Sequence, residues 1–303
     1  MSCLLLDLST INYGSLSYFV CVFIPVLLVA GLYFLLRRRS VWAKKSVIGI
    51  LLFLNLGQHL FKSVLYPQYY GQGFGSISTA YNICAFLIIA SPYVFFLKSN
   101  LWKDFITCLG TAAGLGAMLV PYWFIGQTVF QWEVFRFYLC HGLLFMTSVL
   151  PVLLGLHRLS WRSFWKLPFL YYLMMSLIII NDTVCFALGM YGDPAGDLFA
   201  TLSSLNPGWC MHPNDAFGPI NDLIFALSPD IFLGDAAAGK PYVPILWYAV
   251  PAFLLIAIGG FCVLAIADRK RLKADFMRLK ERLASRRREQ AEKDNRKDEE
   301  LKG

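Results

Sequence analysis

Charged residues are scarce in this chain: only 15% of its 303 residues are Asp, Glu, Lys or Arg, while 57% are hydrophobic. A soluble domain cannot bury that much apolar surface, so the composition excludes an ordinary globular protein. The apolar residues form seven runs of about 20 residues, the length that crosses a hydrocarbon core roughly 30 Å thick. We therefore expect an all-α membrane protein, a bundle of seven membrane-spanning helices over 16–36, 46–66, 77–97, 105–125, 134–156, 167–190 and 243–267.

Motifs for metals, cofactors and nucleic acids are also missing. No cysteine or histidine spacing is typical of a metal site, and no glycine-rich phosphate loop or cofactor fingerprint occurs. We therefore expect neither a bound metal nor a cofactor. Most cysteines lie inside the apolar runs, where a thiol is usually a small hydrophobe. Only Cys3 and Cys210 could meet as a disulfide outside the membrane. The net charge of +8 comes mainly from residues 268–303 and does not require nucleic acid.

Basic residues are almost absent from every second connection between the runs. Of the 27 lysines and arginines, 24 lie in four segments, namely 37–45, 98–104, 157–166 and 268–303. Because such residues gather on the cytoplasmic side, we expect the N-terminus outside and the C-terminus in the cytoplasm. No basic residue precedes the first run, which argues against a signal peptide, so we expect this run to be retained.

The chain divides into a membrane domain, residues 1–267, and a charged cytoplasmic tail, residues 268–303. Within the membrane domain, residues 191–242 form a long outer connection, which we expect to act as a lid and to include a short helix after Pro219. The tail mixes both signs of charge, which is typical of a solvated helix that can contact anionic lipid or a protein partner. We expect a multi-pass integral membrane protein, which in a bacterium would lie in the plasma membrane. Glycines of the fourth run predict a close approach of two helices: Gly110, Gly114 and Gly116.

Polar side chains that are hard to explain in lipid recur at one depth of four runs. Cys84 and His141 each lie seven residues from the outer end of a run, and His59 lies seven from the outer end of another. Asn181 and Asp182 lie at a similar distance in the sixth run. At 1.5 Å per residue, all are roughly 10–14 Å below the outer boundary. Because polar groups in a membrane usually face a bundle interior, this polar layer indicates a site.

The second run carries a polar stripe, since Asn55, His59 and Lys62 share one helix face and are expected to point inward. Structural explanations also exist for each residue. A buried Cys is usually inert, and an intramembrane His usually bonds a neighbouring helix. Asn181 and Asp182 could hold helices together, whereas Lys62 and Arg136 could extend toward the headgroups.

Two short motifs carry a resemblance to a known family. Ser78-Thr-Ala-Tyr-Asn-Ile-Cys84-Ala-Phe-Leu and Phe137-Tyr-Leu-Cys-His141-Gly-Leu-Leu-Phe are similar to motifs of the YwaF-type integral membrane family. That family includes the animal cysteine acyltransferase called transmembrane protein 164. The likeness covers about residues 45–265 and includes the Asn181 region and Asp222. The family often has a His where this chain has Asn82, and the outer connection lacks the family's Gly-Pro-Trp-Pro run.

The resemblance implies acyl transfer between membrane lipids, from a phospholipid to a lysophospholipid. Cys84 would be the nucleophile and His141 the base, because they match the family's pair. Chemically, an imidazole beside a thiol can take its proton and activate sulfur for attack on an ester. Asn181 or Asp182 could orient the imidazole, as the third member of a catalytic triad does.

Two other classes of function stay open. A transporter could line a solute or proton path with the polar stripe and Asp182, although no inverted repeat or pair of broken helices occurs. A membrane scaffold without enzymatic activity could recruit a partner through its charged tail. The enzyme predicts that the Cys84 sulfur and a ring nitrogen of His141 lie within roughly 3–4 Å, because a base needs near hydrogen-bond reach, and that Cys84→Ala abolishes transfer. A phenotype of tail deletion, with the polar layer dispensable, would favour the scaffold.

Overall fold

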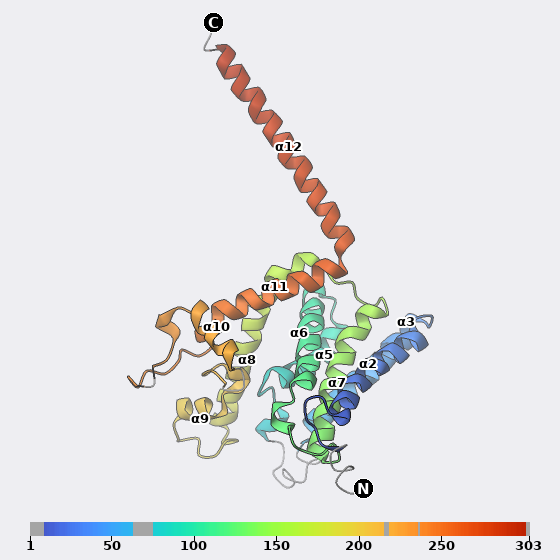
Figure 1. Ribbon diagram of the computed structural model, residues 1–303, viewed down its shortest axis with the longest axis vertical. Coiled ribbons are helices and arrows are strands. Elements are labelled where there is room, and N and C mark those ends of the chain that lie inside the picture. Colours follow the sequence, from blue (N-terminus) through green and yellow to red (C-terminus); the bar gives the residue numbers. More distant parts are fainter. Residues whose placement is uncertain (1–8, 63–74, 215–217, 236, 301–303) are drawn as a thin grey trace.

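The computed structural model describes residues 9–62, 75–214, 218–235 and 237–300 of the chain, and these form an all-α protein (Figure 1). Five helical segments are long and apolar enough to cross a membrane: Leu16–Leu36, Asn100–Phe124, Trp132–Leu153, Trp161–Ala187 and Leu246–Ala267. They correspond to the expected first, fourth, fifth, sixth and seventh runs. The protein is therefore an integral membrane protein with several membrane-spanning helices.

The second and third expected spans differ from the apolar runs. Helix α3, Val41–Leu60, begins at the cap formed by Ser40, whose hydroxyl accepts a hydrogen bond from the Ala43 amide. Helix α5, Ile83–Phe96, begins six residues later than the third run, because the Asn82 side chain caps it. Its 14 residues extend about 21 Å at 1.5 Å per residue, which is shorter than a hydrocarbon core.

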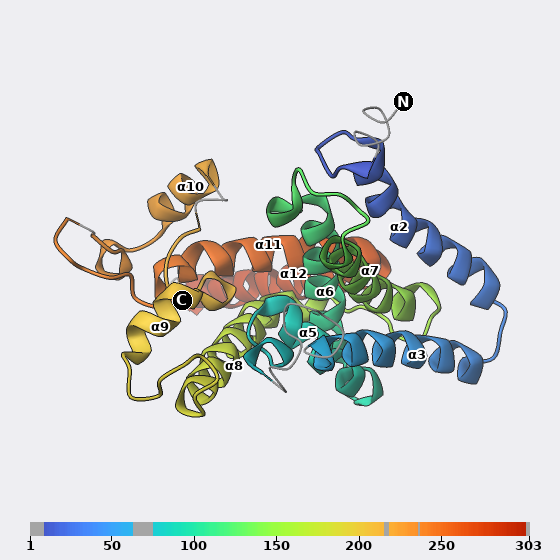
Figure 2. The same ribbon diagram turned by 90° about the horizontal axis from the view of Figure 1, so that it is seen from below.

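Helix α7, Trp132–Leu153, is the most buried of the five long segments and occupies the middle of the molecule (Figures 1 and 2). On one side, α2, Leu16–Leu36, and α3 share a core with it. On the other side, α5, α6 and α8 form a second core with the outer connection. Helix α6 is Asn100–Leu119 and α8 is Leu167–Ala187.

Two glycines bring α6 directly against α7. A Cβ on Gly114 would lie 2.8 Å from the His141 carbonyl oxygen and 2.8 Å from the Phe145 nitrogen, and one on Gly110 would overlap the Ser148 side chain. The expected close approach is confirmed at these two positions. It is wrong for Gly116, where no atom of the described residues lies within 4 Å of the place that a Cβ would take. The α6–α7 contact thus fixes the backbone of His141.

Helix α11, Ala249–Ala267, runs crosswise to α6 and α7 in both views (Figures 1 and 2). It packs on the 3-10 helix η4, Trp161–Lys166, and on the first turns of α8. The Phe253 and Phe169 rings contact edge to face at 5.8 Å, and Gly260 leaves room for Leu167. The long helices therefore do not all run parallel.

Helix α12, Arg269–Glu300, projects away from the bundle (Figure 1). Its first turns are tied to η4, because the Arg162 guanidinium bonds both carboxylate oxygens of Asp275 at 2.8 and 2.6 Å. The Trp161 indole donates to the same carboxylate at 3.0 Å. These hydrogen bonds hold the pKa of Asp275 below its ordinary range.

Three shorter helices lie in the outer connection. They are α9, Leu198–Leu205, the 3-10 helix η5, Pro207–Trp209, and α10, Pro219–Leu227. The expected helix after Pro219 is thus present. Further 3-10 turns are η2, Ser76–Ser78, η3, Tyr122–Phe124, η7, Asp230–Phe232, and η8, Leu246–Tyr248.

Candidate functional site

The segment that leads into α5, residues 76–82, is held from both sides of the molecule through Thr79. The His59 Nε2–H donates to the Thr79 carbonyl oxygen at 3.0 Å from α3. The Asn181 amide donates to the Thr79 hydroxyl oxygen at 2.9 Å from α8, and that hydroxyl donates to the Ser76 carbonyl at 2.6 Å. Two residues expected in one polar layer, His59 and Asn181, therefore meet at a residue that sequence patterns had not singled out.

The polar stripe of α3 faces inward, as expected. Asn55, His59 and Lys62 are all buried, with side chains that bond other segments. The Lys62 ammonium donates to the Ile77 carbonyl at 2.9 Å and to the Tyr81 hydroxyl at 3.3 Å, and it lies 4.7 Å from the centre of the Tyr81 ring. These bonds hold Lys62 inside the protein, so it does not extend toward headgroups.

The imidazole of His141 is oriented by its own helix. Its Nδ1–H donates to the Phe137 carbonyl oxygen at 2.8 Å, one turn earlier in α7, and the ring packs against Phe137. Because a backbone carbonyl only accepts, Nδ1 carries the proton and Nε2 keeps its lone pair. His141 can therefore act as a base through Nε2.

Cys84 is the second residue of α5, directly behind the Asn82 cap, and is half-buried. It packs on the core that contains Cys140, the neighbour of His141. The Asn55 amide donates to the Cys140 carbonyl at 3.3 Å, which joins the polar stripe to α7. Among the described residues no hydrogen bond links Cys84 to His141.

Asn181 and Asp182 do not orient His141. The Asp182 carboxylate is buried and accepts one bond from the Tyr191 hydroxyl at 2.7 Å and another from the Asn181 amide at 3.2 Å. Its second oxygen has no hydrogen-bond partner within the described part of the chain. The pair instead fixes the residues that follow α8 and, through Thr79, those that precede α5.

Two further expected site residues lie at the edges. Arg136 is half-buried in the second turn of α7 and interacts electrostatically with Lys62. Asp222 is exposed in the first turn of α10 and has no hydrogen bond to the polar layer among the described residues. The layer therefore gathers α3, α5, α7 and α8 but leaves α10 outside.

The outer connection covers the start of α5. At η5, Gly208 has a φ of 57° and lies so close to Met175 of α8 and Ile83 that a methyl group there would be 2.8 and 3.4 Å from them. Asn206, with a φ of 41°, sets this turn by accepting bonds from the Met211 and His212 amides at 3.0 and 3.3 Å. The residue before Cys84 is thus in contact with the expected lid.

Cys210 is fully buried under this turn, and burial raises the pKa of its thiol to about 12, so it stays protonated and unreactive. Cys210 forms no disulfide with any described cysteine, and its expected partner Cys3 lies outside the described residues. No cluster of three metal-binding side chains occurs in the described ranges.

Several members of the site went unnoticed at the level of sequence, and they are Thr79, Tyr81, Cys185 and Tyr191. Cys185 lies one turn after Asn181, with its sulfur 3.7 Å from the Thr79 hydroxyl oxygen. The run of small polar residues before Asn82 was the available signal for the first two. Tyr191 follows α8 in an irregular segment, where no periodicity could indicate its contact.

Replacing Thr79 with valine is expected to lower the free energy of unfolding by about 1–2 kcal/mol, because Asn181 loses its acceptor and Ser76 its donor. Thermal unfolding of the purified protein in detergent measures the change. Thr111→Val is the matched control, since the Thr111 hydroxyl is buried without a partner among the described residues and should be lost at no cost. Equal stability of the two variants would contradict the bridging role of Thr79.

Comparison with known families gives one match. A family model described as the TMEM164 family matches residues 12–205, which include Cys84, His141 and the Asn181–Asp182 pair but not Asp222. Comparison with curated proteins and with solved structures gives no match. The matched range covers most of the chain and ends within the outer connection.

Proposed function

Because this chain belongs to the TMEM164 family, we propose that it is a membrane-embedded acyltransferase that moves a fatty acyl chain from a phospholipid to a lysophospholipid. Cys84 is the nucleophile and His141 the base of this proposal. The observation that carries it is the hydrogen bond from His141 Nδ1 to the Phe137 carbonyl. That bond leaves Nε2 as the proton acceptor on the helix whose Cys140 belongs to the core that Cys84 packs against.

In the proposed reaction, Nε2 of His141 takes the proton of the Cys84 thiol, and the sulfur attacks the ester carbonyl of a phospholipid. The ester C–O bond breaks, the leaving lysolipid oxygen receives the proton from His141, and a thioester forms on Cys84. The hydroxyl of a second lysolipid then loses its proton to His141 and attacks the thioester. The C–S bond breaks, and the sulfur recovers the proton.

Two neighbours favour charge separation at Cys84. The sulfur lies in the first turn of α5, and the positive end of a helix stabilises nearby negative charge. The buried Lys62 amino group, which is cationic when protonated, uses two of its N–H groups on Ile77 and Tyr81. Its third N–H suits the oxyanion of the tetrahedral intermediate or a lipid phosphate. Catalytic hydrogen bonds often form only when substrate is bound. The proposal is therefore compatible with the lack of a hydrogen bond between Cys84 and His141 among the described residues.

The proposal includes seven membrane segments, with the N-terminus outside and the C-terminus in the cytoplasm. Helix α3 falls below the hydropathy of a typical span because of Lys44, Lys45 and its polar stripe. That stripe is buried, however, while its exposed face carries Ile50, Phe53 and Leu54, which suit lipid. Residues 76–82 extend the short α5 outward, toward the boundary.

The transporter alternative finds less support. The polar stripe of α3 is bonded within the protein, through Asn55 to Cys140, His59 to Thr79 and Lys62 to Ile77. Groups that line an aqueous path keep donors and acceptors available for the solute, whereas the side chains of this stripe form hydrogen bonds with neighbouring segments of the protein. The scaffold alternative depends on α12, which offers a long charged helix but no contact with the polar layer among the described residues.

Purified protein in nanodiscs tests the proposal directly. Phosphatidylethanolamine and phosphatidylcholine with a labelled acyl chain serve as donors, and a lysophospholipid serves as acceptor. We expect labelled diacyl product to form from the acceptor and a labelled protein adduct that hydroxylamine releases. If folded protein forms neither the labelled product nor the labelled adduct with any of the donors, the proposed acyltransferase activity is overturned.

A further inference from the structure

Two adjoining hollows lie at the end of the bundle that is remote from the polar layer. The first is a cavity of about 300 Å³ between α3, α5, α6 and α7. Its lining includes hydroxyl and ammonium groups from four segments, namely Lys45, Ser91, Lys98, Lys103, Thr107 and Thr147. Ten residues separate Lys45 from Asn55 along α3, or about 15 Å at 1.5 Å per residue, so this cavity is not the site of Cys84.

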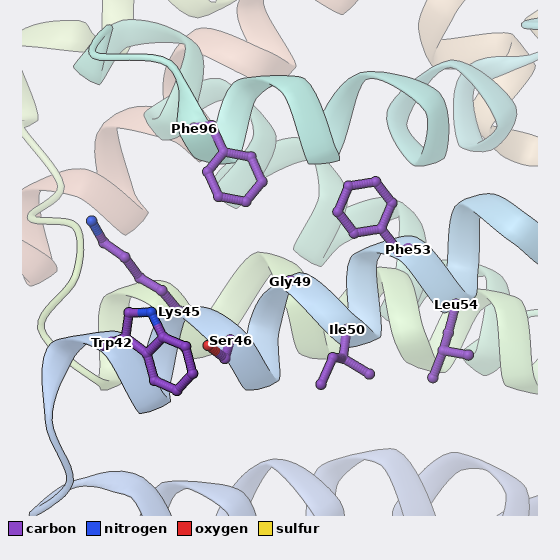
Figure 3. A pocket seen from close by; sticks show the side chains of 8 residues that line it. All are labelled: Trp42, Lys45, Ser46, Gly49, Ile50, Phe53, Leu54 and Phe96. Atoms are coloured by element: carbon purple, nitrogen blue, oxygen red, sulfur yellow. The ribbon is translucent and has the colours of Figure 1, made fainter.

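The second hollow is an apolar groove of about 650 Å³ on the exposed face of α3. Figure 3 shows Phe96 of α5 and Phe53 of α3 both pointing into the space between these two helices, with Lys45 near Trp42 at one end. The groove passes over Gly49, where the lack of a side chain keeps it open below Phe96. Lys45 and Phe96 line both hollows, so the polar cavity and the apolar groove adjoin at these two side chains.

The charge of this paired site has one sign. Within the described residues, the side chains of Lys45, Lys98 and Lys103 form no ion pair or hydrogen bond, and no acidic side chain lines either hollow. Asp104 is fully buried, and its carboxylate is bonded at 2.7 Å to His157, which itself lines the cavity. Three unneutralised ammonium groups beside hydroxyls suit an anionic group, and the attached groove suits an apolar chain.

We propose that this paired site binds an anionic glycerophospholipid of the inner leaflet. The lipid phosphate lies between Lys45, Lys98 and Lys103, and one acyl chain follows the groove of α3 past Phe53 and Phe96. Basic pockets between membrane helices bind anionic headgroups by this combination of charge and position. The site is separate from Cys84 and does not depend on the proposed acyl transfer. Its assignment to the inner leaflet rests on the proposed orientation of the chain in the membrane.

Native mass spectrometry of the full chain in nonionic detergent tests the proposal with dioleoyl phosphatidylglycerol as the probe. We expect one tightly held phosphatidylglycerol and weaker retention of dioleoyl phosphatidylcholine, which has the same chains but no net charge. The triple variant Lys45→Gln, Lys98→Gln, Lys103→Gln should bind phosphatidylglycerol about 100-fold more weakly, since each lysine contributes about a factor of five. Lys98→Gln alone, in an exposed turn, should lose about fivefold and serves if the triple variant folds poorly.

A control variant removes the same charge elsewhere: Lys270→Gln, Lys273→Gln, Lys280→Gln, all exposed on α12. Its phosphatidylglycerol binding should match that of the parent. An equal loss in both triple variants would show attraction by net charge alone and overturn the site. Displacement of the lipid by millimolar inorganic phosphate would indicate a free-phosphate site and overturn the assignment to a lipid. Unchanged phosphatidylglycerol binding by the Lys45, Lys98 and Lys103 variant would overturn both the lipid site and a free-phosphate site at these lysines.

Discussion

Replacing Cys84 with alanine is expected to lower acyl transfer by about 1,000-fold or more, because no other atom in the mechanism can hold the acyl group. The adduct that hydroxylamine releases should disappear together with the product. The measurement is the nanodisc assay with a labelled phospholipid donor and a lysophospholipid acceptor. Thermal unfolding should be almost unchanged, because the half-buried Cys84 thiol forms no hydrogen bond within the described residues.

Two other cysteines make this prediction specific. Cys262→Ala removes an exposed thiol of α11 and should retain full transfer. Cys185→Ala removes the thiol next to Thr79 and should retain the acyl adduct, because Cys185 is buried behind Asn181. Normal transfer by Cys84→Ala, together with its loss in Cys185→Ala, would move the nucleophile to α8 and contradict the assignment to Cys84.

Gly114→Ala is expected to lower the free energy of unfolding by about 2–3 kcal/mol. The new methyl group would lie 2.8 Å from the His141 carbonyl oxygen and 2.8 Å from the Phe145 nitrogen. Both are backbone atoms, so no side-chain rotation can relieve the overlap, and α6 and α7 must separate. Unfolding in increasing concentrations of a denaturing detergent measures the change, and acyl transfer should fall with it because His141 moves.

The same helix supplies the control. Gly116→Ala places a methyl group where nothing in the described structure lies within 4 Å, so only helix propensity should act. That term favours alanine over glycine by about 1 kcal/mol, so this variant should be slightly more stable than the parent. Equal effects of the two substitutions would mean that α6 and α7 do not approach closely at Gly114.

The polar layer shows how far local sequence reasoning reaches. Counting residues along helices placed His59 and Asn181 at one depth, and the two meet at Thr79. It could not identify Thr79, because that residue lies in an irregular segment before α5 whose path depends on contacts from α3 and α8. Nor could it show that the Phe137 carbonyl, rather than Asn181 or Asp182, orients His141, since a helical residue can bond within its own helix or across to another.

The sequence by itself determined that this is an all-α integral membrane protein, because apolar runs of sufficient length must be buried in lipid with their backbone hydrogen bonds satisfied internally. It also determined the inward face of α3 and the family, since both depend on local pattern. Only the tertiary structure decided that α5 is short, that α11 lies crosswise on η4, and that three lysines line one cavity beside an apolar groove. These features arise from contacts between distant segments, whose free energies no local pattern records.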